Sequence, residues 1–104
     1  MLISNECVLR KCDISDYQIE ILEGEGMILV SETKDQIVFF NETAMLLWNM
    51  VDQITLKELF EKYMEALKEE YEITSETDVH RSFEEILSMM MDNSLVDVDS
   101  DKRL

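Results

Sequence analysis

The sequence predicts an α+β protein, in which a three-stranded antiparallel sheet is followed by a three-helix, winged-helix-like unit. Two observations support this prediction. Up to Phe40, short runs of β-branched, aromatic and aliphatic residues are separated by turn residues. From Asn41 onward, apolar residues recur at the three- and four-residue spacing of amphipathic helices. Strands followed by helices along one chain are typical of α+β domains.

Three runs of residues have the pattern expected of strands, and two short turns separate them. The first two runs, residues 17–22 and 27–31, flank Glu23-Gly24-Glu25-Gly26, and a Gly-rich connection of this kind predicts a β-hairpin. A turn at residues 33–35 leads to the third run, residues 36–40, which is rich in β-branched and aromatic residues. Because short connections join antiparallel neighbours, we expect an antiparallel sheet.

Helical periodicity begins directly after the third run. Asn41 is a favourable N-cap for a first helix over residues 42–52. Thr55-Leu56-Lys57-Glu58 has the form of a capping box, in which the Thr hydroxyl accepts from the Glu58 backbone N–H and the Glu58 carboxylate reaches back. This motif predicts the start of a second helix.

A third helix is expected to begin near Ser75 or Thr77. It should end near Asn93-Ser94, because Asn tolerates the left-handed conformation at a C-cap. Each helix has an apolar stripe that we expect to face the core. The stripes are Ala44, Leu47, Trp48 and Val51 on the first helix, Leu56, Leu59, Phe60, Tyr63, Met64, Leu67 and Tyr71 on the second, and Val79, Phe83, Ile86, Leu87 and Met90 on the third.

The predicted domain covers residues 17–98. Residues 1–16 show no clear period, so we expect a flexible N-terminal segment there. Leu95-Val96-Asp97-Val98 is expected to be a short extended segment against the core, and residues 99–104 a polar tail.

Cysteine usage and the lack of a targeting segment predict a cytoplasmic protein. Cys7 and Cys12 are the only cysteines, which argues against a disulfide framework and favours reduced thiols. The first residues lack the basic and apolar regions of a signal peptide. No apolar stretch approaches the ~20 residues that span a bilayer.

The chain is strongly acidic, with 24 acidic and 9 basic residues and a formal net charge of -15. Such a surface repels phosphate, so nucleic acids and anionic membranes are disfavoured as partners. A basic peptide or a basic enzyme face would be attracted. The charge is equally consistent with a role in solubility alone.

The sequence offers no set of residues for catalysis, metal binding or cofactor binding. His80 is the only histidine, and no cysteine or second histidine stands at ligand spacing from it. A single histidine also gives poor support for a catalytic triad. Gly24 and Gly26 do not form a phosphate-binding loop. We therefore expect a non-catalytic protein without a metal or cofactor.

Met89-Met90-Met91 is the most unusual run in the sequence. Successive helical residues are ~100° apart, so three in a row cannot all face one core. Met90 continues the apolar stripe, which leaves Met89 and Met91 at its edges. There they can pack at the margin of the core or offer an adaptable surface to a peptide, and both interpretations stay open.

Several short motifs together resemble one known family over roughly residues 17 to 98. They are Phe40-Asn41-Glu42-Thr43-Ala44 with Trp48 and Asp52, Thr55-Leu56-Lys57-Glu58-Leu59, and the closing pattern of Ile86-Leu87, Met90 and Ser94-Leu95-Val96. The family that these motifs resemble is PqqD, whose members are also called RiPP recognition elements. The chain departs from it at Gln53, Ser82 and Ser94, where the family often has Gly, Asp and Gly.

The resemblance implies a domain that binds the leader region of a ribosomally made precursor peptide and presents it to a maturation enzyme, such as a radical-SAM protein, a cyclase or a protease. In this family the leader adds as a further strand beside the third strand, in a groove against the third helix. By position, the peptide-binding residues are Gln36, Ile37, Val38, Phe39 and Phe40, with Ser82, Ile86 and Met89 on the helix side. A mainly core role for Ile37 to Phe40 also stays open, because apolar strands are usually core.

Two other functions compete with peptide binding. A winged-helix DNA-binding regulator would share the arrangement of helices, but Arg81 is the only Lys or Arg of the third helix. A regulatory subunit could instead dock on an enzyme without touching a peptide. A homodimer is also open, since exposed strand edges can pair between copies.

Overall fold

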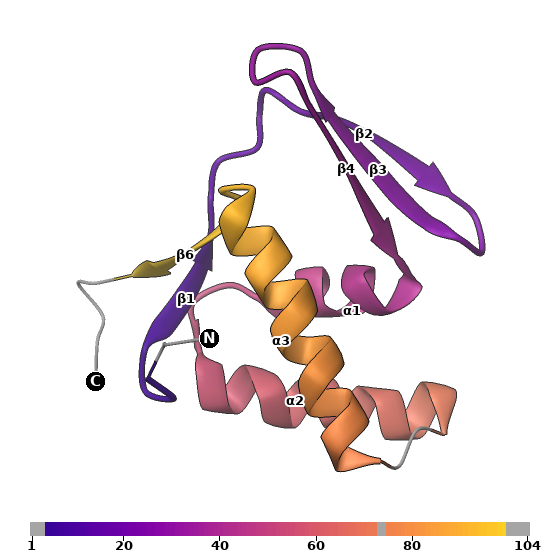
Figure 1. Ribbon diagram of the computed structural model, residues 1–104, viewed down its shortest axis with the longest axis vertical. Coiled ribbons are helices and arrows are strands. Elements are labelled where there is room, and N and C mark those ends of the chain that lie inside the picture. Colours follow the sequence, from indigo (N-terminus) through magenta and orange to yellow (C-terminus); the bar gives the residue numbers. More distant parts are fainter. Residues whose placement is uncertain (1–3, 73–74, 100–104) are drawn as a thin grey trace. The chain divides into compact units, whose positions relative to one another are not determined.

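The computed structural model describes residues 4–72 and 75–99, and it shows an α+β protein (Figure 1). The predicted fold class is confirmed, with a three-stranded antiparallel sheet and three helices, and a second sheet is also present. The chain divides into a sheet unit, Asp13–Asn49, and a helix unit, which consists of the described residues of Met1–Cys12 and Met50–Leu104. The elements in chain order are β1 (Val8–Lys11), β2 (Gln18–Leu22), β3 (Gly26–Ser31), β4 (Gln36–Asn41), α1 (Glu42–Met50), β5 (Ile54–Thr55), α2 (Leu56–Tyr71), α3 (Glu76–Asp92) and β6 (Val96–Asp99).

The sheet unit contains the three strands that the sequence predicts, each within one residue of its expected bounds. β3 lies between β2 and β4 and pairs antiparallel with both. The first turn is closed by the Glu25 backbone N–H, which donates to the Leu22 carbonyl oxygen at 2.9 Å. The second is closed by the Asp35 N–H, which donates to the Glu32 carbonyl oxygen at 3.3 Å. β2 and β4 are therefore the two outer strands of this sheet.

β4 leads directly into α1, and one aromatic contact joins the two elements. The side chain of Asn41, the last residue of β4, accepts a hydrogen bond from the Ala44 backbone N–H at 2.8 Å, which confirms the predicted N-cap. The Trp48 ring of α1 has its centroid 5.6 Å from that of Phe40. α1 therefore packs on the face of the sheet that holds Phe40. It ends at Met50, two residues earlier than predicted.

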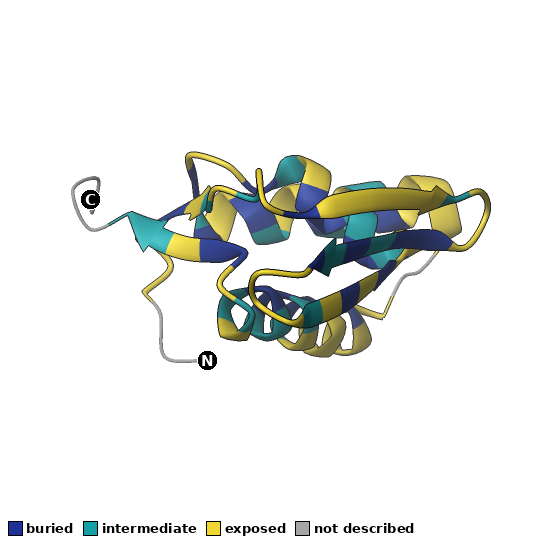
Figure 2. Cartoon of the chain, turned by 90° about the horizontal axis from the view of Figure 1, so that it is seen from above, coloured by how far each residue is buried: buried dark blue, intermediate teal, exposed yellow. Residues whose placement is uncertain are grey.

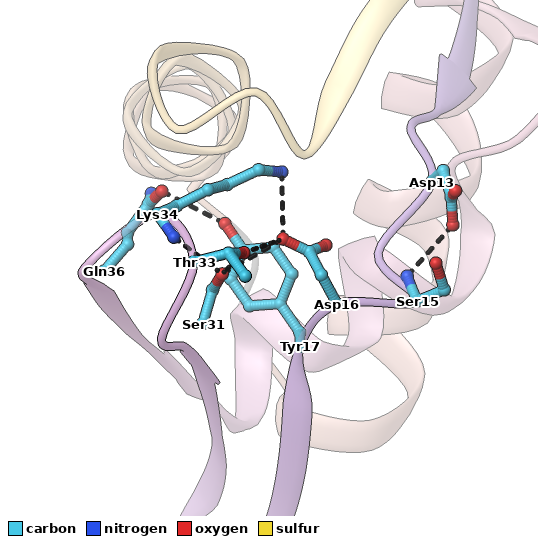
Figure 3. A network of polar contacts seen from close by, with 8 residues as sticks. All are labelled: Asp13, Ser15, Asp16, Tyr17, Ser31, Thr33, Lys34 and Gln36. Carbon is cyan, nitrogen blue, oxygen red and sulfur yellow. Dashed lines mark hydrogen bonds and ion pairs between the residues drawn. The ribbon is translucent and has the colours of Figure 1, made fainter.

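Asp16 is the centre of a polar network between the chain before β2 and the turn after β3 (Figure 3). The hydroxyls of Ser31 and Thr33 each donate to Asp16 Oδ2 at 3.0 Å, and Lys34 Nζ lies 3.6 Å from the same oxygen. The pKa of Asp16 lies below its ordinary value, chiefly because of the Thr33 hydrogen bond, with Ser31 and Lys34 acting in the same direction. The network thus favours the charged carboxylate and holds the turn to the start of the sheet.

The second sheet belongs to the helix unit and is centred on β1. β1 lies between β5 and β6 and pairs antiparallel with both. Both ends of β1 are also tied by backbone hydrogen bonds, from the Leu56 N–H to the Cys7 carbonyl oxygen at 3.0 Å and from the Cys12 N–H to the Leu95 carbonyl oxygen at 2.9 Å. Cys7, Val8 and Leu9 are buried.

The prediction of a flexible segment over residues 1–16 is therefore wrong at residues 8–11, which are a central strand. The partners of β1 are residues 54–55 and 96–99, so its pairing leaves no local periodic pattern. Residues 1–3 lie outside the described part of the chain. At the other end, Asp99 belongs to β6, which includes most of the predicted extended segment, and the rest of the predicted polar tail also lies outside.

α2 and α3 each bury one stripe and expose the opposite side, as Figure 2 shows. The N-cap of α2 is the predicted Thr55, and the N-cap of α3 is Ser75, one of the two starts that the sequence left open. Thr55 Oγ1 accepts from the Glu58 N–H at 3.2 Å, and Ser75 Oγ accepts from the Asp78 N–H at 3.4 Å. Among the described residues no helix is long and apolar enough to cross a membrane. The buried stripe residues are Leu56, Leu59, Tyr63 and Leu67 on α2, and Val79, Phe83, Leu87 and Met90 on α3.

The end of α3 is at the predicted place but uses a different residue for the left-handed position. Asn93 has a φ of −93°, whereas Ser94 has a φ of 60°. The Leu95 N–H donates to the Met90 carbonyl oxygen at 2.8 Å, and the Ser94 N–H donates to that of Met91 at 3.0 Å. These two bonds form a Schellman motif. Asn93 contributes through its side chain, whose amide donates to the Met89 carbonyl oxygen at 2.8 Å.

The Asp16 network gives a prediction about pH. Thr33→Ala should raise the pKa of Asp16 toward that of an unfolded chain, about 3.9, because it removes the hydrogen bond that lowers this pKa the most. Since the folded pKa is the lower one, the stabilisation is fully present above about pH 4 and is lost as the pH falls through the folded pKa. NMR titration of the Asp16 carboxyl carbon measures the change. Ser15→Ala, which alters a hydroxyl outside the network, should leave this pKa unchanged, and an equal rise in both variants would contradict the assignment.

The two glycines of the first turn should differ in their tolerance of a side chain. At Gly26, where φ is +145°, an added Cβ would lie 1.9 Å from the Phe40 carbonyl oxygen, whereas at Gly24, where φ is +78°, nothing lies within 4 Å. Gly24→Ala should lower the free energy of unfolding by about 1–2 kcal/mol through backbone strain alone. Gly26→Ala should lower it by at least about 3 kcal/mol, because the clash is with backbone. Urea denaturation measures both, and equal costs would show that β3 and β4 do not approach this closely.

Candidate functional site

β4 is an outer strand, and its free side is the candidate site. One side of its backbone pairs with β3, and within the described residues the other side is the edge of the sheet. The N–H and C=O groups on such an edge can pair with a strand from another chain. The strand part of the predicted site, residues 36–40, lies entirely in β4.

The side chains of β4 form two rows that differ in exposure. Ile37 is 74% exposed and Phe39 is 52% exposed, whereas Val38 and Phe40 are buried. Successive strand residues point to opposite faces, so Ile37 and Phe39 share one face of the sheet. A core role therefore holds for Val38 and Phe40 but not for Ile37 and Phe39. Gln36 is half-buried, and its Oε1 accepts a hydrogen bond from the Tyr17 hydroxyl at 3.1 Å.

The exposed row of β4 continues onto β3, where the sequence predicted no site residue. Ile28 pairs with Phe39 and Val30 pairs with Ile37, and both β3 residues are half-buried. Directly paired residues of antiparallel strands lie on the same face, so these four side chains form one apolar surface, here called the outer face. The uninterrupted apolar run of residues 27–30 is the feature of the sequence that indicates this surface. A strand that is apolar at every position presents apolar side chains on both faces of its sheet.

β4 differs from the other outer strands in being both long and free of charged residues. Natural edge strands are usually protected from pairing by charges, by shortness or by proline. β2 carries Glu20 at its centre, β6 carries Asp97 and Asp99, and β5 is only two residues long. The six residues of β4, Gln36–Asn41, include none of these protections. The protein thus leaves this edge open to pairing while it protects the others.

β2 also has two exposed apolar residues, although alternation placed them on the core side. Ile19 pairs with Leu29 and Ile21 pairs with Met27, so all four lie on the same face. Leu29 and Met27 are buried, but Ile19 is 49% exposed and Ile21 is 60% exposed. An outer strand has neighbours on one side only, which leaves these side chains partly uncovered. They provide a matched comparison for Phe39.

The helix part of the predicted site lies on α3, in the helix unit. Ser82, Ile86 and Met89 are spaced so that they form one row along the helix. Ser82 is exposed, and Ile86 and Met89 are half-buried beside the buried stripe. Ile86 was expected within the stripe itself, so α3 buries a narrower face than predicted. The predicted site therefore consists of two surfaces, one on each unit.

The sheet unit is strongly negative. Lys34 is its only basic residue, against eight acidic ones, for a net formal charge of −7. A positively charged segment would therefore be attracted to this unit. The acidic residues are Asp13, Asp16, Glu20, Glu23, Glu25, Glu32, Asp35 and Glu42.

Comparison with known proteins does not assign the chain to a family. No protein-family model, no curated protein and no solved structure matches it. Within residues 4–72 and 75–99, no group of three or more His, Cys, Asp and Glu side chains could hold a metal ion. The geometry of the chain itself is therefore the basis on which a function can be argued.

Proposed function

We propose that this protein binds a peptide by strand addition at the free edge of β4 and presents it to a separate enzyme that modifies the peptide. The observation that carries this proposal is the uncharged edge of β4, with Ile37 and Phe39 exposed on it. An edge of this kind invites pairing, and a protein that did not use it would be at risk of aggregation. In this proposal the chain is non-catalytic.

Backbone pairing and side-chain contacts would contribute differently to binding. The backbone of the added strand would pair with the backbone of β4, which almost any extended peptide can do and which therefore gives no selectivity. Its side chains would alternate between the two faces of the sheet. Those on the outer face would pack beside Ile37 and Phe39, which favours apolar residues at every second position of the peptide.

The charge of the sheet unit favours a peptide with lysine or arginine between those apolar positions. Eight acidic residues against Lys34 alone would raise the local concentration of a basic peptide and its rate of association. The exposed carboxylates would be screened by salt, so this part of the affinity would depend on ionic strength.

The PqqD-like motifs support a more specific form of the proposal. The peptide would be the leader of a ribosomally made precursor, and the enzyme a radical-SAM protein, a cyclase or a protease. Ser82, Ile86 and Met89 of α3 would contact the same peptide. We place this activity in the cytoplasm because the two cysteines, Cys7 and Cys12, form no disulfide.

A regulator that binds duplex DNA is the less favoured alternative. On α3, Arg81 stands against five acidic residues and lies 3.7 Å from one of them, Asp78. A recognition helix needs a surplus of basic residues to meet phosphates. The charge of α3 therefore favours a peptide partner over duplex DNA.

A matched pair of variants tests the edge. The probe is a fluorescent peptide selected against the intact chain from a random display library. Phe39→Lys should weaken its binding by about tenfold or more, because it replaces an apolar contact on β4 with a charge that repels a basic peptide. Ile21→Lys makes a similar change at a similarly exposed position on β2 and should leave binding within about twofold.

Circular dichroism checks that both variants keep the fold. We expect that they do, because the side chains of Phe39 and Ile21 are exposed. If Ile21→Lys weakens binding and Phe39→Lys does not, the peptide pairs with β2 and the proposed site is wrong. If neither variant weakens binding, the proposal of strand addition to this sheet is wrong.

The same peptide gives a second test, through salt. Raising NaCl from 0.02 M to 0.15 M shortens the Debye length to about 8 Å and should weaken binding by roughly three- to tenfold if the acidic sheet unit attracts the peptide. Fluorescence anisotropy measures the dissociation constant at each concentration. A control peptide with every lysine and arginine replaced by glutamine should bind more weakly and show little salt dependence. Equal salt dependence of both peptides would contradict charge attraction.

A further inference from the structure

The helix unit contains a cavity of about 470 Å³ between α2 and α3. Every described residue that lines it belongs to this unit, so the cavity is a separate site from the edge of β4. Its size falls in the range of cavities that bind small molecules or inserted side chains. Neither the strand-addition proposal nor the predicted site residues make use of it.

Three aromatic side chains, Phe60, His80 and Phe83, form one part of the wall of the cavity. The Phe60 ring centroid lies 5.1 Å from that of Phe83 and 5.2 Å from that of His80, and both contacts are edge-to-face. Phe83 is buried and Phe60 is half-buried, so part of the Phe60 ring remains open to the cavity. Two edge-to-face contacts fix the orientation of Phe60, which gives a preformed apolar surface.

The same cavity carries a surplus of negative charge. Glu61, Glu76 and Glu84 line it, and Lys57 is the one lysine or arginine among the lining residues that the structure describes. Glu84 Oε1 lies 3.4 Å from His80 Nδ1. Within the described residues, Glu61 and Glu76 form no ion pair, so their carboxylates are available to a ligand.

From these two features we infer that the cavity binds an arginine side chain of a partner protein. The methylene stem would lie along Phe60, because long cationic side chains bury their stems on apolar surfaces. The guanidinium would meet the glutamates, for which its planar fork of donors is suited, and it can also stack on an aromatic ring. An uncharged apolar group would leave the glutamates unused, and an acidic group would be repelled.

The proposed partner is the enzyme that receives the peptide. The identification of the partner as this enzyme rests on the proposed function. The preference of the cavity for an arginine side chain does not. A partner held at α2 and α3 would use none of the β4 residues, so the chain could hold peptide and enzyme through different side chains. The acidic character of the whole chain, with a net charge of -15, favours an enzyme with a basic docking face.

The cavity is tested with a dipeptide probe, acetyl-leucyl-arginine amide, by NMR titration of the intact isotope-labelled chain. Saturable shifts are expected at Phe60, His80 and Glu84, with binding at least about fivefold weaker for the neutral isostere acetyl-leucyl-citrulline amide. The triple variant E61Q/E76Q/E84Q should weaken arginine binding by about tenfold or more, since it removes the carboxylates. The control E65Q/E69Q/E70Q changes the net charge equally, at exposed glutamates of α2 outside the cavity, and should bind within about twofold of the unchanged chain.

Three results would overturn the inference. They are equal binding of the arginine and citrulline probes, an equal loss in the control variant, and shifts that lie away from the cavity. The outcome is independent of the edge of β4, because E61Q/E76Q/E84Q should retain the library-selected peptide and Phe39→Lys should retain the arginine probe. Loss of one activity without the other therefore identifies which proposal has failed.

Discussion

The pairing of β3 with β4 is the interaction on which the sheet unit depends. β3 is the one strand of this sheet with a neighbour on each side, and it supplies apolar residues to both faces. The chain at Gly26 and Phe40 approaches so closely that only glycine fits, which fixes the register at that end of the strands. With the register fixed, Val38 and Phe40 must face the core, and Ile37 and Phe39 must face outward. The exposed row at the free edge is thus a consequence of the same pairing that builds the core.

In the helix unit the corresponding constraint is β1. It pairs with β5, which leads into α2, and with β6, which follows α3, so a four-residue strand joins the two ends of the helical region. Local patterns could not reveal this arrangement. Residues 8–11 read Val-Leu-Arg-Lys, two buried apolar residues followed by two charged residues. This run is too short to show the alternation of apolar and polar residues that is typical of a strand. Pairing over long sequence separations depends on partner strands that lie far away in the sequence, so it leaves no pattern in the residues of β1 themselves.

Where the signal is local, the sequence was a sufficient guide. Asn41, Thr55 and Ser75 each cap a helix through a hydrogen bond to a residue three positions later, so the residue type at one position decides the outcome. The strands and turns of the sheet unit are local in the same way. At Ser94, residue type alone did not predict the position of the left-handed residue. Asn is the better left-handed residue by propensity, but the Schellman bonds of Leu95 and Ser94 set the left-handed position one residue later. The cavity between α2 and α3 has no signal in the sequence, because Phe60 and Phe83 meet only when two helices pack together.

The energetics of strand addition explain why exposed apolar residues matter at the candidate site. Each backbone hydrogen bond contributes a net ~1 kcal/mol, while ordering one residue of a free peptide costs about 1–2 kcal/mol. Backbone pairing alone therefore cannot hold a short peptide on β4. Burying an Ile or Phe side chain contributes about 1.5–3 kcal/mol. Further burial of the exposed side chains of Ile37 and Phe39 can therefore shift the balance toward binding. The affinity must then depend on apolar side chains of the peptide that reach this face. An edge that binds through its side chains selects among peptides, whereas an edge that bound through backbone alone would pair with any extended chain, including its own copies.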